Sequence, residues 1–313
     1  MSKEMMYQRD VYGKTLVELG KEDKSIVVLD ADLSGSTRTS FFNMEFPDRF
    51  FNFGVAEQNM IATAAGMASC GKTVFASTFA MFATGRAWDQ LRNSVCYSNM
   101  NVKLVATHAG ITVGPDGATH QALEDIALMR VIPNMTVIVP CDGPQTKDAI
   151  KAAVKIRGPV YVRLGREKVT TIEGLGNFEV GKVNVLRKGK NIAIFACGIM
   201  TEQALIAAEE LSKCAIECSV INVHTIKPLD VDTVDKITKK IGSIIICEEH
   251  SVIGGLGCAI EEVIAETGRG VRVARIGVNN RFGQSGSSQD LLREYKLRSV
   301  DIIEIAKKLH SKS

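Results

Sequence analysis

The sequence predicts an α/β protein with two doubly wound domains, each built on a mostly parallel sheet. Short apolar runs rich in Val and Ile alternate with longer segments of helical hydrophobic spacing. The length of 313 residues suits two domains of about 150 residues each. A polar, Gly-containing stretch at 168–189 interrupts the alternation. We therefore expect domains at 1–167 and 190–313, joined by a linker that forms a short hairpin.

The first domain is expected to contain five buried strands, because five apolar runs are each bounded by polar residues or glycine. These runs lie at 25–32, 74–78, 102–110, 135–143 and 159–166. Segments of helical spacing stand between them or flank them, at 11–22, 57–70, 89–98 and 143–156. Alternation of this kind indicates right-handed parallel strand–helix–strand units.

The same alternation restarts after the linker and predicts the second domain. Its four strand candidates lie at 191–198, 215–224, 242–250 and 271–278. The helices expected between them lie at 201–213, 230–241 and 255–267. Within this domain we expect His224 to be a structural loop residue and Glu248 to His250 to form a solvated loop, so its predicted role is packing and assembly.

Composition excludes several classes of protein. Hydrophobic residues make up 45% and charged residues 23%, with a formal net charge of +3, which gives no electrostatic reason to expect a nucleic-acid partner. No run approaches the ~20 apolar residues that span a bilayer, and the polar N-terminus lacks the apolar core of a secretory signal. Eight scattered cysteines form no C-x-x-C pair, so we expect reduced thiols, a cytoplasmic location and no metal site in this chain.

Polar and aromatic side chains follow the predicted strands of the first domain. Ligands of open α/β sheets bind outside the carboxyl ends of the strands, so these side chains are candidates for a common site. Taken singly, each can equally be a surface or hydrogen-bonded loop residue. The candidates are Asp30, Asp32, Ser34, Ser36, Phe79, Phe82, His108, Arg163 and Arg166.

Two interpretations are open for Glu57, and two for the pair formed by Phe79 and Phe82. Glu57 lies in the first turn of the expected helix 57–70, where a carboxylate complements the helix dipole. Desolvated at a packed interface, it could instead share a proton with a ligand nitrogen. The two phenylalanines are three residues apart, which is typical of a core face but also suits a stacking platform for a planar heterocycle.

The Gly-rich segment AGITVGPDGATHQ, at 109–121, predicts tight turns and close backbone approach. It lacks the pattern of a phosphate-binding P-loop. Asp116 and His120 in this loop could bind a polyhydroxylated substrate and transfer protons. An ordinary capped loop before the next helix is the alternative.

Several motifs together resemble the pyrimidine-binding domain of thiamine-diphosphate enzymes in the transketolase group. They are VAEQNMIATAAGMA, ASTFAMF, THAGITVGPDGATHQALEDIA, VIVPCDGPQT and VRLGRE. INVHTIKPLD, EEHSVIGGLG and RFGQSG resemble the C-terminal domain that follows it, so the likeness spans nearly the whole chain. The family's G-D-G motif, which marks the domain that holds the diphosphate, is missing. The chain therefore resembles the C-terminal subunit of a split transketolase.

This resemblance implies a partner, a cofactor and an assembly. The partner is a separate N-terminal subunit, which would hold the diphosphate of thiamine diphosphate through Mg²⁺ (or Ca²⁺). Family cofactor sites lie between protomers, so two copies of each chain are expected in a heterotetramer. The apolar, small-residue helix 57–70 is the candidate contact.

The resemblance also assigns roles at the cofactor. Glu57 matches the glutamate that protonates the aminopyrimidine ring, and Phe79 and Phe82 match aromatics that pack on this ring. Asp32 matches an acidic residue near the cofactor cleft. The family often has a third aromatic where this chain has Gly85, so the platform is reduced or supplied otherwise.

Further residues match the family's substrate-binding positions. His120 and Asp116 match the pair near the reacting sugar hydroxyls. A second group matches positions that bind the sugar phosphate, and Arg166 fits this role better than Arg163 does. The members of this group are His108, Ser36, Arg166 and Arg9.

The activity implied is transfer of a two-carbon ketol unit from a ketose phosphate to an aldose phosphate, as in the pentose phosphate pathway of carbohydrate metabolism. Two related readings keep the cofactor and change the substrates: a deoxyxylulose-phosphate synthase-like enzyme, or the beta subunit of a 2-oxo-acid dehydrogenase. A reading of another class is a non-catalytic regulatory subunit that kept the fold. The phosphate-binding candidates and the split architecture favour transketolase, and the 2-oxo-acid dehydrogenase beta subunit fits the sugar-binding loop less well. Intact Glu57, Asp116 and His120 argue against loss of catalysis.

Overall fold

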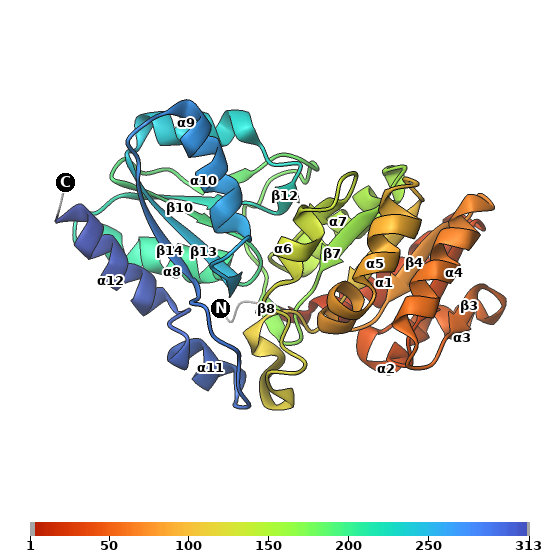
Figure 1. Ribbon diagram of the computed structural model, residues 1–313. Helices are drawn as coiled ribbons and strands as arrows, with labels where there is room; N and C mark the ends of the chain where they lie inside the picture. The colour runs from red at the N-terminus through yellow and green to blue at the C-terminus, as the bar shows by residue number, and fades with distance from the viewer. Residues whose placement is uncertain (1–3, 312–313) are drawn as a thin grey trace.

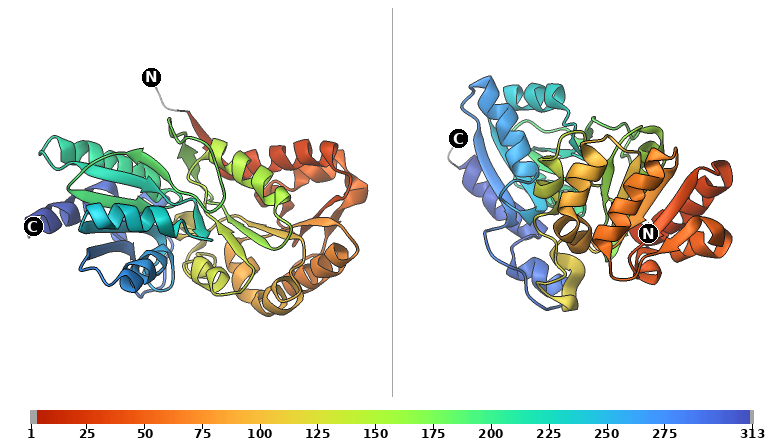
Figure 2. Two further views of the ribbon diagram at one scale, coloured as in Figure 1. Left: turned by 90° about the horizontal axis from the view of Figure 1, so that it is seen from above. Right: turned by 45° about the vertical axis from the view of Figure 1, so that its right-hand side comes forward.

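The computed structural model describes residues 4–311 and shows two α/β lobes side by side (Figure 1). The first lobe carries the N-terminal half of the chain and the second carries the C-terminal half, as the two further views show (Figure 2). The prediction of two α/β domains with mostly parallel sheets is therefore confirmed.

The sheet of the first lobe has seven strands within residues 4–311, in the order β12-β6-β7-β5-β4-β2-β3. All neighbours are parallel except β12 and β6. The strands are β2 (Ile26–Asp30), β3 (Phe50–Asn52), β4 (Thr73–Ser77), β5 (Val102–Ala106), β6 (Thr136–Ile138), β7 (Val160–Arg163) and β12 (Thr225–Lys227).

Helices cover both faces of this sheet, which explains why its central strands are apolar throughout. Val28 of β2 packs in the cluster that includes α1 (Gln8–Glu22) and α7 (Gly143–Lys155), while Leu29 packs in the cluster that includes α4 (Glu57–Ser69). This alternation follows from the two-residue period of a strand. Because both faces of the sheet are packed, the sheet is a rigid support for the loops that leave the carboxyl ends of its strands.

The second lobe contains a sheet with the order β14-β13-β10-β11-β9 among the residues described. Only the pair β11 and β9 is antiparallel. The strands are β9 (Asn184–Arg187), β10 (Ile192–Ala196), β11 (Cys218–Asn222), β13 (Ser243–Ser251) and β14 (Arg272–Val278). The helices are α8 (Met200–Ser212), α9 (Val231–Lys240), α10 (Leu256–Thr267), α11 (Ser288–Glu294) and α12 (Ser299–His310).

The two lobes are joined more intimately than a linker alone would join them. Strand β12 belongs to the second half of the sequence but pairs with β6 at the edge of the first sheet. One apolar cluster contains Val139 of the first lobe together with Phe195 and Val223 of the second. The lobes therefore share a core across their interface.

The prediction of a hairpin in the linker is wrong. Its two strands pair with partners distant in the sequence: β8 (Lys168–Thr170) with β1 (Met5–Tyr7), and β9 with β11. Both pairings are antiparallel, and each satisfies the backbone groups of a polar segment at an edge that would otherwise stay open. The linker thus ties the N-terminus to the first lobe and extends the second sheet.

A second difference concerns the helix expected at 89–98. The chain instead forms a short α5 (Trp88–Gln90) followed by a π-helical turn, η3 (Leu91–Cys96), and another π-helical turn, η2 (Phe82–Arg86), precedes it. Such turns are rare and occur frequently at functional sites. Separately, no helix within residues 4–311 is both long enough and apolar enough to cross a membrane.

Candidate active site

The carboxyl ends of β4 and β5 carry an aromatic cluster. His108, which adopts a φ of 58°, stacks on Phe79 with ring centroids 3.9 Å apart. Phe79 and Phe82 lie with their rings nearly parallel at 6.1 Å. The edge of His120, which comes from the Gly-rich loop, meets Phe82 at 5.2 Å. Four predicted site residues from two separate loops are thus brought together.

Glu57 is the first residue of α4 and is 2% exposed. Its Oε1 accepts a 2.7 Å hydrogen bond from Nη1 of Arg86, while its Oε2 is buried without a partner in the described part of the chain. The guanidinium of Arg86 also lies 4.5 Å from the ring centroid of Phe82. A buried carboxylate oxygen with no donor is costly unless a further group binds it. Oε2 of Glu57 can therefore accept one further hydrogen bond, and Arg86 connects this carboxylate to the ring of Phe82.

His108 and Arg9 form the basic end of the site. Nη1 of Arg9 lies 3.5 Å from Nε2 of His108 and 3.4 Å from the carbonyl oxygen of Ser36. An arginine can only donate, so Nε2 accepts, and Nδ1 of His108 carries the proton that it shares with Oγ1 of Thr107 at 2.8 Å. Burial and then the charges of Arg9 and Arg166 lower the pKa of His108 to about 3. The ring is therefore neutral and stands in a positive field suited to an anion.

Arg166 joins this end to the Gly-rich loop. Its Nη1 donates to the carbonyl oxygen of Val113 and, at 3.2 Å, to Oδ1 of Asp116. Asp116 ends the short helix η4 (Ile111–Asp116), and His120 follows with its Nδ1 2.9 Å from Oγ1 of Thr119. Arg166 and Asp116 are about one-third exposed, so both remain accessible to a ligand.

Arg163 has a different environment. It is 5% exposed and pairs with Asp125 at 2.7 Å, and Tyr161 donates to the same carboxylate oxygen at 2.6 Å. Its Nη2 also donates to the carbonyl oxygen of Glu249 in the second lobe at 2.9 Å, so Arg163 is buried at the lobe interface. Arg166 is therefore the arginine of this pair that the fold leaves available.

Asp32 and Asp30 also differ. Asp32 is exposed, has a φ of 65°, and shares hydrogen bonds with Asn52, so its assignment to the cofactor cleft stays a prediction. Asp30 is fully buried and accepts bonds from the hydroxyls of Thr37 and Thr39, both at 2.8 Å. Burial raises the pKa of Asp30 although these donors oppose the effect. Asp30 shapes the loop that presents Ser36.

The second lobe supports the Gly-rich loop at several points. Oε1 of Glu249 accepts a 2.7 Å bond from the backbone N of Thr112, and Oγ of Ser288 donates to the carbonyl oxygen of the same residue at 3.1 Å. Nε2 of Gln121 donates to the carbonyl oxygens of Ile111 and of Gln284 in the other lobe, at 3.1 and 2.9 Å. In Figure 1, α11 lies directly beside this loop. Both ends of the loop are therefore held from across the interface.

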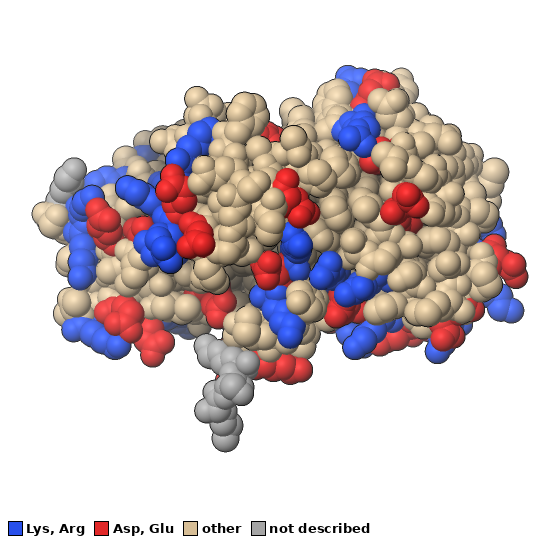
Figure 3. All heavy atoms as spheres, turned by 90° about the horizontal axis from the view of Figure 1, so that it is seen from below, with Lys and Arg blue, Asp and Glu red and all other residues tan. Residues whose placement is uncertain are grey.

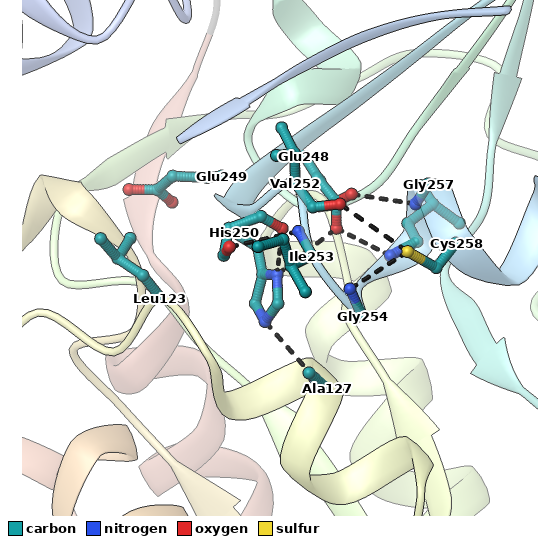
Figure 4. A network of polar contacts seen from close by, with 12 residues as sticks. Leu123, Ala127, Glu248, Glu249, His250, Val252, Ile253, Gly254, Gly257 and Cys258 are labelled. Carbon is teal, nitrogen blue, oxygen red and sulfur yellow. Dashed lines mark hydrogen bonds and ion pairs between the residues drawn. The ribbon is translucent and has the colours of Figure 1, made fainter. Parts of the chain in front are cut away.

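The expectation that Glu248 to His250 form a solvated loop is wrong, because none of the three is more than 3% exposed. Glu248 accepts from the backbone N atoms of Leu256 and Gly257 at the start of α10. Glu249 points to the opposite side of β13, and Nε2 of His250 accepts from Ala127 N at 3.4 Å (Figure 4). Buried charges require such partners. The sequence signal for this burial was the group of glycines at 254, 255 and 257. They mark the start of a helix, where a carboxylate can come close to the backbone N–H groups.

His224, expected to be a structural loop residue, is fully buried at the interface. Its Nδ1 lies 2.9 Å from Oγ1 of Thr225, and its ring packs 4.3 Å from that of Phe178. Burial lowers the pKa of His224 to about 4. Among the described residues, its side chain contacts Thr225 and Phe178 and not the aromatic cluster, so it lies at the interface of the lobes.

Two family models match the chain: the transketolase pyrimidine-binding domain over residues 4–171 and the transketolase C-terminal domain over 181–302. The chain belongs to the transketolase family. A protein of Methanocaldococcus jannaschii that bears the name of a transketolase C-terminal section is 51% identical over 94% of this chain and 93% of its own length. A 6-deoxy-6-sulfo-D-fructose transketolase subunit from Clostridium sp. strain MSTE9 is 41% identical over 95% and 92%.

A solved split-gene transketolase, described as an inactive beta4 tetramer, has the same fold. Its TM-score is 0.89 at 48% identity, and the match covers 98% of this chain and 99% of that one. Transketolase membership implies use of thiamine diphosphate. The site fits the pyrimidine end of that cofactor, because Glu57 offers a buried oxygen without a partner among the described residues, and Arg86 connects the same carboxylate to the aromatic ring of Phe82.

Proposed function

We propose that this chain is the C-terminal subunit of a thiamine-diphosphate-dependent split transketolase. With a separate N-terminal subunit it would transfer a two-carbon ketol unit from a ketose phosphate to an aldose phosphate. The observation that carries the proposal is Oε2 of Glu57, which is buried and has no partner in the described part of the chain, while Arg86 links the other oxygen of this carboxylate to the ring of Phe82. Thiamine diphosphate, when bound, supplies the carbon nucleophile and the electron sink of the reaction.

In this proposal Glu57 holds a proton against a ring nitrogen of the pyrimidine. Phe79 and Phe82 exclude water from that ring, which strengthens the hydrogen bond. Arg86 donates to Oε1 of Glu57 and stacks on Phe82. In this proposal its guanidinium partly replaces the third stacking aromatic, which this chain lacks at Gly85.

The remaining residues would bind the sugar. His120, whose ring edge meets Phe82, would orient hydroxyls and move a proton there, and Asp116, held by Arg166, would bind a further hydroxyl. The phosphate would bind at the basic end, where two guanidinium groups and a neutral imidazole converge and Ser36 adds a polar group. The members of that end are Arg9, Ser36, His108 and Arg166.

The proposal includes an assembly and a location. The N-terminal subunit would hold the diphosphate and Mg²⁺ (or Ca²⁺), and two of each chain would form a heterotetramer. The outward face of α4 supports this contact, because Asn59, Ala62 and Gly66 are exposed and small and permit close approach. A cytoplasmic location is supported by the eight cysteines, all of which are unpaired.

The test is a reconstitution. This chain, its partner subunit, thiamine diphosphate and Mg²⁺ are mixed with xylulose 5-phosphate and ribose 5-phosphate, and we expect sedoheptulose 7-phosphate. Glu57→Gln should reduce turnover by about 10²-fold or more, the scale of lost acid–base catalysis. Glu45→Gln is the matched control, because Glu45 is exposed and lies outside the site.

Three results would redirect or reject the proposal. Consumption of pyruvate and glyceraldehyde 3-phosphate with release of carbon dioxide would indicate deoxyxylulose-phosphate synthase-like activity. Tight association of the subunits without any turnover would indicate a regulatory chain. Normal turnover by Glu57→Gln would remove the acid–base role.

A further inference from the structure

The segment 283–287, which leads from β14 into α11, lies directly against the Gly-rich loop. A Cβ on Gly117 would come within 2.6 Å of Oγ of Ser285, and a Cβ on Gly114 within 3.4 Å of the carbonyl oxygen of Gly286. Figure 3 views the molecule from the side on which η4 and α11 lie, and basic and acidic side chains are interspersed there along the junction of the lobes. The fit of the loop to this segment therefore depends on short-range contacts, and not on a surface charge of one sign.

Gln121 joins the loop to this segment through its side chain. It follows His120 directly and is 3% exposed. Its Nε2 donates to the carbonyl oxygen of Ile111, at the start of η4, at 3.1 Å. The same nitrogen donates to the carbonyl oxygen of Gln284, in the segment, at 2.9 Å. One amide group therefore connects the start of the loop, the end of the loop beside His120, and the second lobe.

The surroundings fix the orientation of this amide. Both hydrogen-bond partners of Nε2 are carbonyl oxygens, which only accept, so the nitrogen and not the oxygen must face them. Oε1 then lies against Gly283, where it is buried and has no partner among the described residues. A buried acceptor without a donor costs stability. An apolar side chain of similar size would avoid this cost but could not hold the two carbonyl oxygens, which is the property that glutamine supplies here.

Gly283 provides the space that this amide occupies. A Cβ at Gly283 would overlap Oε1 of Gln121, while the nearest atom of another residue is Cδ1 of Ile111 at 2.9 Å, the end of a flexible side chain. The φ of Gly283 lies outside the left-handed region, so this overlap, and not backbone strain, sets the cost of a side chain here. The neighbouring backbone is anchored to its own lobe, because Tyr295 donates to the carbonyl oxygen of Phe282 at 2.8 Å.

We propose that Gln121 is a positioning residue for sugar binding, and that Gly283 of the second lobe provides the place from which it acts. The inference rests on the proposed function, because the loop that Gln121 holds carries Asp116 and His120. Gln121 acts through the position of these two side chains and not by contact with the reacting atoms. A displacement of about 1 Å in such a site can cost about 10²-fold in rate. The second lobe thereby contributes to sugar binding without supplying a catalytic group.

The first test is Gln121→Met in the reconstituted enzyme. Methionine keeps the size of the side chain and removes both donors and the unpartnered oxygen, so the protein should stay folded. We expect the KM for xylulose 5-phosphate and ribose 5-phosphate to rise about 10-fold and kcat to fall about 10-fold, while the Kd of thiamine diphosphate is unchanged. Loss of folded enzyme alone would lower kcat and leave each KM unchanged. A wild-type KM in this variant, or a parallel loss of thiamine-diphosphate affinity, would overturn the positioning role.

A double-mutant cycle tests the part given to Gly283. Gly283→Ala should lower kcat/KM about 10²-fold in the wild-type background. In a Gln121→Ala background the overlapped amide is absent, so the same substitution should change kcat/KM by about 2-fold or less. Equal losses in the two backgrounds would overturn the inference. If Gly283→Ala alone does not fold, we expect the double variant to recover folding, and its failure to do so would overturn the inference as well.

Gly242→Ala is the matched control for the glycine substitution. Gly242 also belongs to the second lobe, is exposed, and has open space where a Cβ would lie. Gly242→Ala should therefore leave kcat and each KM unchanged. Absence of ketol transfer by the wild-type enzyme would instead reject the proposed function, and the sugar-binding role of the loop with it.

Discussion

The carboxylate of Glu249 lies against Gly110, and its Oε1 accepts the backbone N–H of Thr112 at 2.7 Å. One buried side chain of the second lobe thus contacts the entry of the loop that carries Asp116 and His120. Burial raises the pKa of Glu249, which the charge of Arg163 and the Thr112 bond oppose. The second domain therefore acts on the site through the position of this loop.

Replacement of Glu249 should affect sugar binding before it affects cofactor binding. Glu249→Ala leaves the Thr112 N–H unpaired, at a cost of about 1–3 kcal/mol in unfolding free energy. With the loop displaced, we expect the KM for sugar phosphates to rise about 10-fold or more. Glu249→Gln keeps an acceptor oxygen and should retain most affinity. If the Gln and Ala variants behave alike, or if thiamine-diphosphate affinity falls in parallel with sugar affinity, the loop-positioning role is wrong.

Gly110 should tolerate no side chain. Its φ of 83° strains any other residue, and a Cβ at this position would overlap the Glu249 carboxylate. Gly268 has a φ of 64° with open space around it, so it shares the strain without the overlap. We expect Gly268→Ala to cost about 1 kcal/mol and Gly110→Ala about 4 kcal/mol in unfolding free energy, measured in urea. Similar losses at both positions would show that strain alone matters.

The ion pair of Glu57 and Arg86 should be asymmetric. Glu57 is buried, whereas the side chain of Arg86 is 47% exposed. Arg86→Ala leaves a buried carboxylate unpaired and should cost about 2 kcal/mol, while Glu57→Gln leaves an arginine that water can solvate and should cost less than about 1 kcal/mol. A double-mutant cycle with denaturant unfolding measures their coupling. The reverse order of costs would contradict the burial argument.

Acid should destabilise the protein partly through His108. Its pKa is about 3 in the fold against an ordinary value of 6.5, so below pH 6.5 the unfolded chain binds a proton that the native state refuses. The free energy of unfolding should therefore fall as the pH drops from about 6.5 toward 3. His108→Gln should show a smaller fall over this range. His224 contributes in the same direction but is present in both proteins, so an unchanged pH profile would place His108 outside this effect.

The parts that sequence predicts well are those whose signal is local. β2 reads Ile-Val-Val-Leu-Asp because helices cover both faces of its sheet, and a continuous apolar run indicates this arrangement. The aromatic cluster was also accessible, since Phe79, Phe82, His108 and His120 all lie in motifs near strand ends.

Interactions between distant segments were not accessible in this way. Glu249 and Thr112 are 137 residues apart in the sequence. The sequence around either residue contains no pattern that predicts their contact. The linker hairpin was a wrong prediction for the same reason, because β8 and β9 find better partners at remote edges. The role of Arg86 as the partner of Glu57 had one sequence signal. Arg86 is a cation that follows Gly85, the position at which an aromatic is missing.

The pairing of β12 with β6 in the first sheet constrains how this chain can be cut into fragments. A fragment ending in the linker would expose the hydrogen-bonding groups of β6, which would then recruit strands from other molecules. The halves are consequently poor building blocks for recombination with foreign domains, although the sequence reads as two modules. Only a chain that contains both β6 and β12 completes that edge of the sheet.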